Sequence, residues 1–203
     1  MTSSGLHLAL AGLLAALLLT GCSSSAPRVT YYSLYAPAQQ PLPAKAPAPT
    51  PLVVSVGPVT IPDILKQAPI ATGGADGRYQ LSEHHRWSGE LDRDMARAVA
   101  EQLAGNLGTE QVAIFPWDQQ FKPTCRVLLD VLSMGGERGA EATLQVRWAL
   151  VDPAGEVALL VRRSDLRAVP AQPGYAAWVA AQQRNIVTLG QEIAAAITLR
   201  AGR

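Results

Sequence analysis

Cys22 is the side chain in this sequence whose type and setting point most clearly to chemistry. It closes the tetrapeptide Leu19-Thr20-Gly21-Cys22 and follows the uncharged apolar run Leu8 to Leu19. That run is shorter than the about 20 apolar residues that a membrane-spanning helix needs. Small residues before the cysteine are typical of a signal-peptide cleavage site. The pattern therefore predicts that residues 1–21 are removed as a signal peptide, which leaves Cys22 at the new amino terminus.

Together these residues resemble a bacterial lipoprotein signal, and the resemblance implies the modification of Cys22. Its thiol would carry a diacylglyceryl group, and the amino group exposed by cleavage would carry a further acyl chain. Two or more acyl chains anchor a protein stably where one holds only marginally, so this covalent lipid would tether the mature protein to a membrane. The alternative is an ordinary secretory signal followed by an incidental cysteine.

Other side chains that could do chemistry lack a supporting motif. His84 and His85 are the only histidines after the signal, and neighbouring residues of a strand point to opposite faces. Glu83 and Asp63 could accompany them, but no metal-ligand spacing occurs, so we expect a structural role. Cys125 lies in a strand-like apolar run, where a thiol is usually a small buried hydrophobe. Without a Gly-x-Ser-x-Gly, P-loop or dinucleotide motif, the sequence predicts no enzyme, no metal site and no cofactor.

Charge and cysteine content limit the classes of partner and fold. The 203 residues carry a formal net charge of +1, which provides no strong field for nucleic acid or for anionic lipid. Once Cys22 is acylated, Cys125 is the one remaining thiol, so no intrachain disulfide can form. An apolar core must then stabilise the fold, and the mature length suits one domain.

A proline-rich stretch separates the first predicted strand from the rest of the chain. Residues 29–35 are rich in Val, Thr and Tyr, which favour strands, whereas residues 36–51 contain six prolines and favour polyproline II. We interpret 29–35 as a strand of the domain and 36–51 as a long loop after it. Residues 22–28 would then form a lipidated tether of about 20 Å when fully extended. The alternative is a disordered stalk over residues 23–51.

Beyond the prolines, strand and helix periods alternate. Apolar stripes of helical period predict a helix from Trp87 to Leu107, capped by Ser88 and ended by Gly108, and a closing helix from about 174 to 199. Short β-branched or alternating runs predict strands at 52–59, 78–82, 112–115, 125–132, 142–151 and 157–166, with turns at 73–77, 135–139 and 152–155. Each helix buries only one stripe. The predicted fold is therefore α+β, a two-layer sandwich in which two amphipathic helices cover a largely antiparallel or mixed sheet.

Two places are predicted to contact a partner protein. Trp117 follows Pro116 in a polar stretch, and aromatic residues are enriched at interfaces. Ile64 and Leu65 lie in an apolar loop bounded by proline, and such a loop needs cover from another element. The remaining tryptophans fall on apolar stripes, and we expect them in the core: Trp87, Trp148 and Trp178.

Four short segments, in their order and spacing, resemble a known protein family. They are Tyr31-Tyr32-Ser33-Leu34, Val56-Gly57-Pro58-Val59-Thr60-Ile61-Pro62, Arg86-Trp87 and Trp148-Ala149-Leu150. With the closing helix, they make the chain similar over about residues 30–198 to the PqiC-like family of ABC-type transport auxiliary lipoproteins. The chain departs from the family around Leu65, where it has Ile64 and Lys66-Gln67 in place of an aromatic residue and an Asp-Arg pair.

The resemblance implies a lipid-anchored accessory protein of the bacterial envelope, with its domain over residues 29–201. Such a protein would serve an MCE-type lipid transport system, dock its MCE-domain protein and membrane permease, and could form a homo-oligomer. Ser23 follows Cys22 where an aspartate would favour the inner membrane, so we expect the outer membrane of a Gram-negative bacterium, with the domain facing the periplasm. The alternatives are a structural or assembly lipoprotein of another envelope complex and a carrier that holds one lipid inside its fold.

Overall fold

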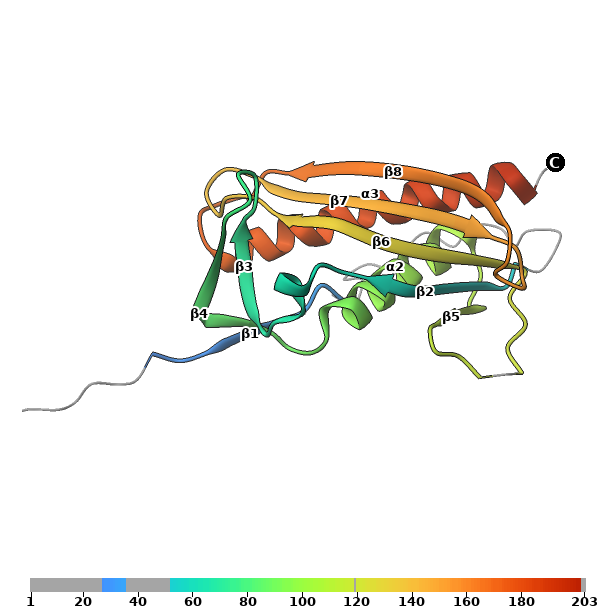
Figure 1. Ribbon diagram of the computed structural model, residues 1–203, viewed down its shortest axis with the longest axis horizontal. Helices are drawn as coiled ribbons and strands as arrows, with labels where there is room; N and C mark the ends of the chain where they lie inside the picture. Colours follow the sequence, from blue (N-terminus) through green and yellow to red (C-terminus); the bar gives the residue numbers. More distant parts are fainter. Residues whose placement is uncertain (1–26, 36–51, 119, 202–203) are drawn as a thin grey trace, which may run out of the picture.

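The protein is described by a computed structural model over residues 27–35, 52–118 and 120–201, which contains two sheets and two long helices (Figure 1). The smaller sheet has the strand order β1-β4-β3, with bounds β1 (Thr30–Tyr32), β3 (Pro69–Gly73) and β4 (Tyr79–Trp87). The larger sheet has the order β5-β2-β6-β7-β8, with bounds β2 (Val54–Thr60), β5 (Val112–Ile114), β6 (Cys125–Gly135), β7 (Ala142–Val151) and β8 (Ala158–Ala168). The helices are α2 (Leu91–Leu107) and α3 (Tyr175–Ala201), and η1 (Asp63–Lys66) is a short 3-10 turn.

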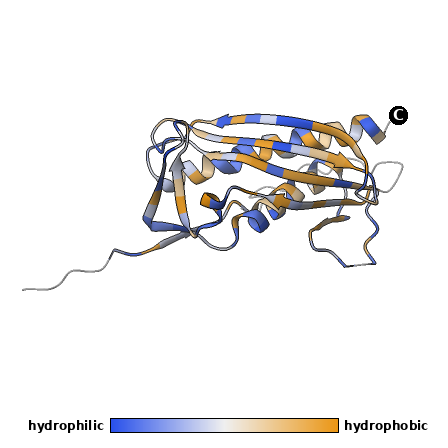
Figure 2. Ribbon diagram, in the orientation of Figure 1, coloured by the Kyte–Doolittle hydropathy of each residue, from blue (hydrophilic) through white to orange (hydrophobic). Residues whose placement is uncertain are grey.

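The predicted α+β sandwich is confirmed, because α2 and α3 cover one face of the five-stranded sheet (Figure 1). Apolar and polar residues largely alternate along β6 and β7 (Figure 2), so that one face of each of these two strands is buried against the helices. In β8 the buried residues are Ser164 and Leu166. The opposite face carries charged side chains, among them the Asp130–Arg147 ion pair at 3.5 Å. The predicted single sheet is instead two. Within the residues that the structure describes, β1, β3 and β4 pair only among themselves apart from one bridge between Gly73 and Gly136.

Strand β2 lies inside the larger sheet, parallel to both β5 and β6. Its β-branched side chains Val54 and Val56 are fully buried, as expected for a central strand. The strand predicted over 52–59 continues through Pro58, since pairing with β6 resumes at Val59 and runs to Thr60. The register shift between Val56 and Val59 is a bulge, and a proline is tolerated there because a bulge leaves backbone groups outside the ladder.

Helix α2 begins later than the sequence pattern predicts. The backbone N–H of Trp87 donates to Ala68 O at 2.8 Å, and that of Ser88 donates to Tyr32 O at 2.8 Å. These bonds hold both residues in the smaller sheet, so Ser88 does not cap the helix, and Glu90 precedes its first residue instead. The predicted end is confirmed: Gly108 has φ 67° and its N–H donates to Ala104 O. Glycine adopts this left-handed conformation without steric cost.

The first strand belongs to the domain, which rejects the stalk alternative for residues 30–35. β1 pairs in parallel with β4, and the Leu34 side chain is buried. The Asp94 carboxylate of α2 accepts hydrogen bonds from the Ser33 hydroxyl at 2.9 Å and from the Leu34 N–H at 2.5 Å. In Figure 1, β1 and β5 lie toward opposite ends of the long axis of the molecule.

Helix α3 carries one polar interruption on its buried stripe, and the structure gives it a role. The Gln182 side chain is 1 % exposed, and its amide donates to the carbonyls of Gly135 at 3.0 Å and Thr143 at 3.1 Å. Asn185 donates to Ala142 O at 3.0 Å. Buried polar groups are costly unless they are hydrogen-bonded, so these amides fix α3 against the β6–β7 turn.

Candidate functional site

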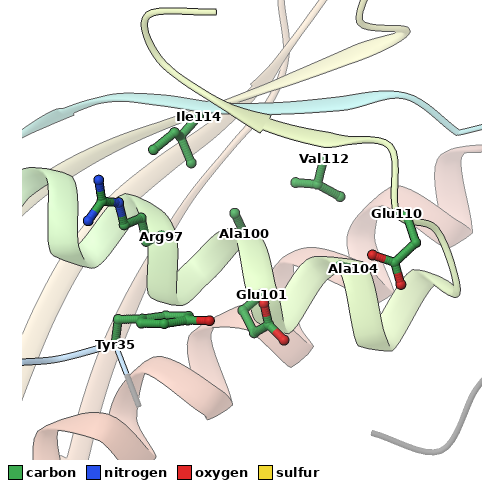
Figure 3. Close-up of a pocket in the computed structure, with 8 residues that line it drawn as sticks. All are labelled: Tyr35, Arg97, Ala100, Glu101, Ala104, Glu110, Val112 and Ile114. Carbon is green, nitrogen blue, oxygen red and sulfur yellow. The ribbon is translucent and has the colours of Figure 1, made fainter. Parts of the chain in front are cut away.

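A groove of about 410 Å³ opens between α2 and β5, at one edge of the larger sheet (Figure 3). Its apolar lining comes from Val112 and Ile114 of β5 and from Ala100 and Ala104 of α2, while Tyr35 lines the far side. Helix α2 extends beyond the short strand β5, and the small alanine side chains leave the space between them unfilled. The groove is therefore a concave, largely apolar surface next to a strand edge.

Three charged side chains line the groove at different positions: Arg97, Glu101 and Glu110. In Figure 3 the Arg97 side chain lies toward the Ile114 end, and the Glu110 carboxylate lies toward the Val112 end. Within the described ranges, none of the three forms an ion pair. The groove thus has a basic end and an acidic end whose charges can meet a partner.

Trp117 lies in the loop that follows β5, and its ring contacts the Phe115 ring and the Arg126 guanidinium group. Its ring meets that of Phe115 edge-on, with 5.6 Å between centroids, and the Arg126 guanidinium carbon lies 5.0 Å from the Trp117 centroid. Arg126 is itself held by a 2.8 Å hydrogen bond from Nη1 to Ala154 O. Phe115 is 47 % exposed and Trp117 is partly buried. Cation–π contacts orient such a ring, and partner contact at Trp117 stays a prediction.

The two residues of the second predicted contact, Ile64 and Leu65, differ in burial. Both residues lie in η1, where Leu65 is 2 % exposed and Ile64 is partly buried against the core. Leu65 is therefore unable to meet a partner in this conformation, and its predicted contact is corrected to a core role. The cover that the loop needs comes from the protein itself, since η1 packs against α2 and β3. Contact through Ile64 stays a prediction.

The two histidines lie in an irregular part of β4. The Ser82 hydroxyl accepts hydrogen bonds from the N–H groups of His84 and His85, which breaks the strand's regular alternation. His85 shares a 2.9 Å hydrogen bond between its Nδ1 and the Tyr32 hydroxyl, and its ring stacks on Tyr175 at 4.1 Å. Desolvation lowers the pKa of His85 below its usual value, with smaller effects from His84 and Arg138. These contacts join β1, β4 and α3 and serve the fold.

Cys125 is buried, and burial raises the pKa of its thiol, which disfavours the nucleophilic thiolate. The other three tryptophans are buried, as predicted: Trp87, Trp148 and Trp178. Among the residues that the structure describes, no three His, Cys, Asp or Glu side chains gather as around a metal ion. No helix in these same ranges has the length and apolar character to span a bilayer.

Several sequence predictions lie outside the described residues. They are the signal over 1–21, the lipid attachment at Cys22, the Ser23 sorting signal and the proline-rich loop over 36–51. Sequence reasoning proposed Trp117 as a partner contact, which stays a prediction, and it missed the groove beside β5. The row Arg97, Ala100 and Ala104, at helical spacing on α2, is the signal that could have indicated it, because small residues there leave a helix surface open.

Comparisons with known proteins place this fold among solved structures. The model of a family described as ABC-type transport auxiliary lipoprotein component matches residues 32–194. A crystal structure of an uncharacterized protein is 17% identical and superposes with a TM-score of 0.64, covering 84% of this chain and 99% of that one. A Xanthomonas campestris protein assigned to DUF330 is 15% identical with a TM-score of 0.64, covering 81% and 92%. The PelC dodecamer from Paraburkholderia phytofirmans is 13% identical with a TM-score of 0.44, covering 73% and 92%. A search of curated proteins returned no match.

Proposed function

Since this chain belongs to the family of ABC-type transport auxiliary lipoproteins, we propose that it is a lipid-anchored accessory subunit of an MCE-type lipid transport system. It acts by docking partner proteins and catalyses no reaction. The family match over residues 32–194 is the observation that carries this proposal, because it spans nearly the whole described domain. The partners are the MCE-domain protein and the membrane permease of the transporter.

The anchor and the docking surface lie at opposite ends of the molecule in this proposal. Acyl chains on Cys22 hold the amino terminus in the outer membrane, and the tether to residue 28 reaches about 20 Å at most. The β1 end of the domain then faces the bilayer from the periplasmic side. Strand β5, which borders the groove and precedes Trp117, lies toward the other end (Figure 1), where a partner that crosses the periplasm would meet it.

The anchor is tested on the full chain expressed with its own signal in a Gram-negative host. We expect the mature amino-terminal peptide to carry the mass of three acyl chains at Cys22, and the protein to sediment with outer-membrane markers. Cys22→Ser removes the thiol that accepts the lipid, so this variant accumulates as an unprocessed precursor. A Cys125→Ser variant is the matched control and matures normally. Normal maturation of Cys22→Ser would contradict the anchor.

The partners are tested by crosslinking in the native host, followed by purification and mass spectrometry. Recovery of an MCE-domain protein and a permease supports the proposal. Recovery of only peptidoglycan-linked or secretion-system proteins identifies instead a structural lipoprotein of another envelope complex. Native mass spectrometry of the detergent-free protein tests a lipid carrier, which the charged lining of the groove does not favour.

A further inference from the structure

Strand β5 is an edge strand whose outer backbone groups point away from the sheet. Val54 N–H donates to Gln111 O, and Phe115 N–H donates to Val56 O, each at 2.9 Å. Backbone groups of successive strand residues point to opposite sides, so those of residues 111, 113 and 115 face β2. The N–H of Ile114 and the carbonyls of Val112 and Ile114 therefore face outward. Within the described residues, these three groups form no hydrogen bond.

The groove lies beside this edge. If another strand paired with β5, every second side chain of that strand would point into the groove. Val112 and Ile114 point their side chains into the groove, toward α2 (Figure 3). A strand added to β5 would lie about 4.8 Å away and would point every second side chain to the same side. Those side chains would fill the space over Ala100 and Ala104.

From this geometry we infer that the β5 edge binds an extended segment of the partner protein, which adds to the larger sheet as a further strand. In strand addition, main-chain hydrogen bonds supply affinity, and pockets for alternate side chains supply specificity. The segment carries apolar side chains at alternate positions. It has an acidic group at the end near Arg97 and a basic group at the end near Glu110, because the groove has the complementary charges.

The inference deepens the proposed function and rests on it, because it states how the docking subunit holds its transporter partner. Two variants remove different parts of the site. Ile114→Pro removes the outward N–H, and proline is tolerated on an edge strand where that N–H faces solvent. Ala104→Trp fills the groove without changing the backbone. Ala195→Trp makes the same change at an exposed site of α3 and is the matched control.

The experiment measures the partner that co-purifies with each full-length variant from native membranes, alongside its thermal unfolding. We expect both groove variants to retain the partner at least about tenfold less well, a loss typical of an interface hot spot. The control retains it fully. Equal retention by Ala104→Trp, with unchanged unfolding, overturns the inference. Absence of any transporter partner from the unmodified protein overturns the proposed function instead.

Photocrosslinking in cells, with a photoreactive side chain in place of Ala104, identifies which segment occupies the groove. A crosslinked segment of the MCE-domain protein or permease with apolar residues at every second position supports strand addition. An amphipathic helical segment, a second copy of this chain or the proline-rich residues 36–51 of the same chain as the crosslinked site would each overturn it. The mass of the adduct and its mapped peptide distinguish these products.

Discussion

The two edges of the larger sheet differ in length, charge and cover. β8 has 11 residues, four of them charged: Arg162, Arg163, Asp165 and Arg167. β5 has three residues, none of them charged. Side chains of α3 also bind the β8 region, since Arg200 donates to Leu159 O at 3.3 Å and Arg184 donates to Val169 O at 2.6 Å. The Ser164 hydroxyl donates to the Glu192 carboxylate.

This difference indicates that the β8 edge is protected against pairing with another chain and that the β5 edge is open to it. A long exposed edge is a template for pairing with another chain, and charged side chains on it discourage that pairing. β8 follows this rule over residues 162–167. β5 is short, and Pro116 soon ends it, so it risks little unspecific pairing. Its side chains also border the groove, so in our inference β5 binds a specific extended segment of the partner, whose side chains enter the groove.

The largest expected effect is on stability, and it contrasts Trp148, which contacts the β8 edge, with Trp117, which follows the β5 edge. Trp148 of β7 is 1 % exposed, and its Nε1 donates to Ser164 of β8 at 2.9 Å. Trp148→Ala should lower the free energy of unfolding by about 3–5 kcal/mol, because it removes a large buried ring. Trp117→Ala should change it by less than about 1 kcal/mol and should instead weaken partner retention. Urea denaturation and co-purification measure the two effects, and equal destabilisation by both variants would erase the distinction.

A second prediction removes the charges that protect β8. The double variant Arg163→Val and Asp165→Val deletes an exposed ion pair of 3.0 Å, whose loss should cost less than about 1 kcal/mol. We expect concentration-dependent association beyond that of the unmodified protein, because the edge becomes apolar. Analytical ultracentrifugation measures it. The control is Glu90→Val with Arg93→Val, which removes a pair of the same charges at 3.9 Å near the start of α2. Identical behaviour of both pairs would show that the charges do not protect the edge.

The smallest expected effect concerns the turn that leads into β8. The Asp152 carboxylate accepts hydrogen bonds from the N–H groups of Val157 at 2.9 Å and Glu156 at 2.7 Å. The bond from Val157, with help from Glu156, lowers the pKa of Asp152 below its usual value. The carboxylate therefore stabilises the fold above the unfolded-state pKa of about 3.9, and this contribution is lost as the pH falls through the lower folded-state pKa.

Asp152→Asn should accordingly flatten the loss of stability between pH 5 and pH 3, as measured by urea denaturation across that range. Glu156→Gln, at an exposed carboxyl in the same turn, is the control. A slope unchanged by the Asn substitution would mean that the turn does not set the acid stability of the β8 edge.

Local sequence patterns correctly predicted the helices and strands that are determined by interactions between residues close together in the chain. The alternation over 142–151 coincides with β7, and Gly108 ends α2 as its position after the apolar stripe indicates. The prediction failed where distant segments compete for the same backbone. Trp87 fits a helical stripe, but its N–H bonds to Ala68 in the smaller sheet. Leu65 looked like an exposed loop residue because sequence periodicity does not show that α2 covers it.

The sequence by itself determined the family, the α+β class and most strands and helices, because periodicity and turn residues act within a few positions along the chain. It also proposed a partner contact at Trp117, which is partly buried, and this contact stays a prediction. Only the tertiary structure decided that the strands split into two sheets, that β5 lies at an edge and that a groove opens beside it. Which strand pairs with which depends on contacts between residues far apart in the chain. The site therefore exists only where β5 and α2 meet.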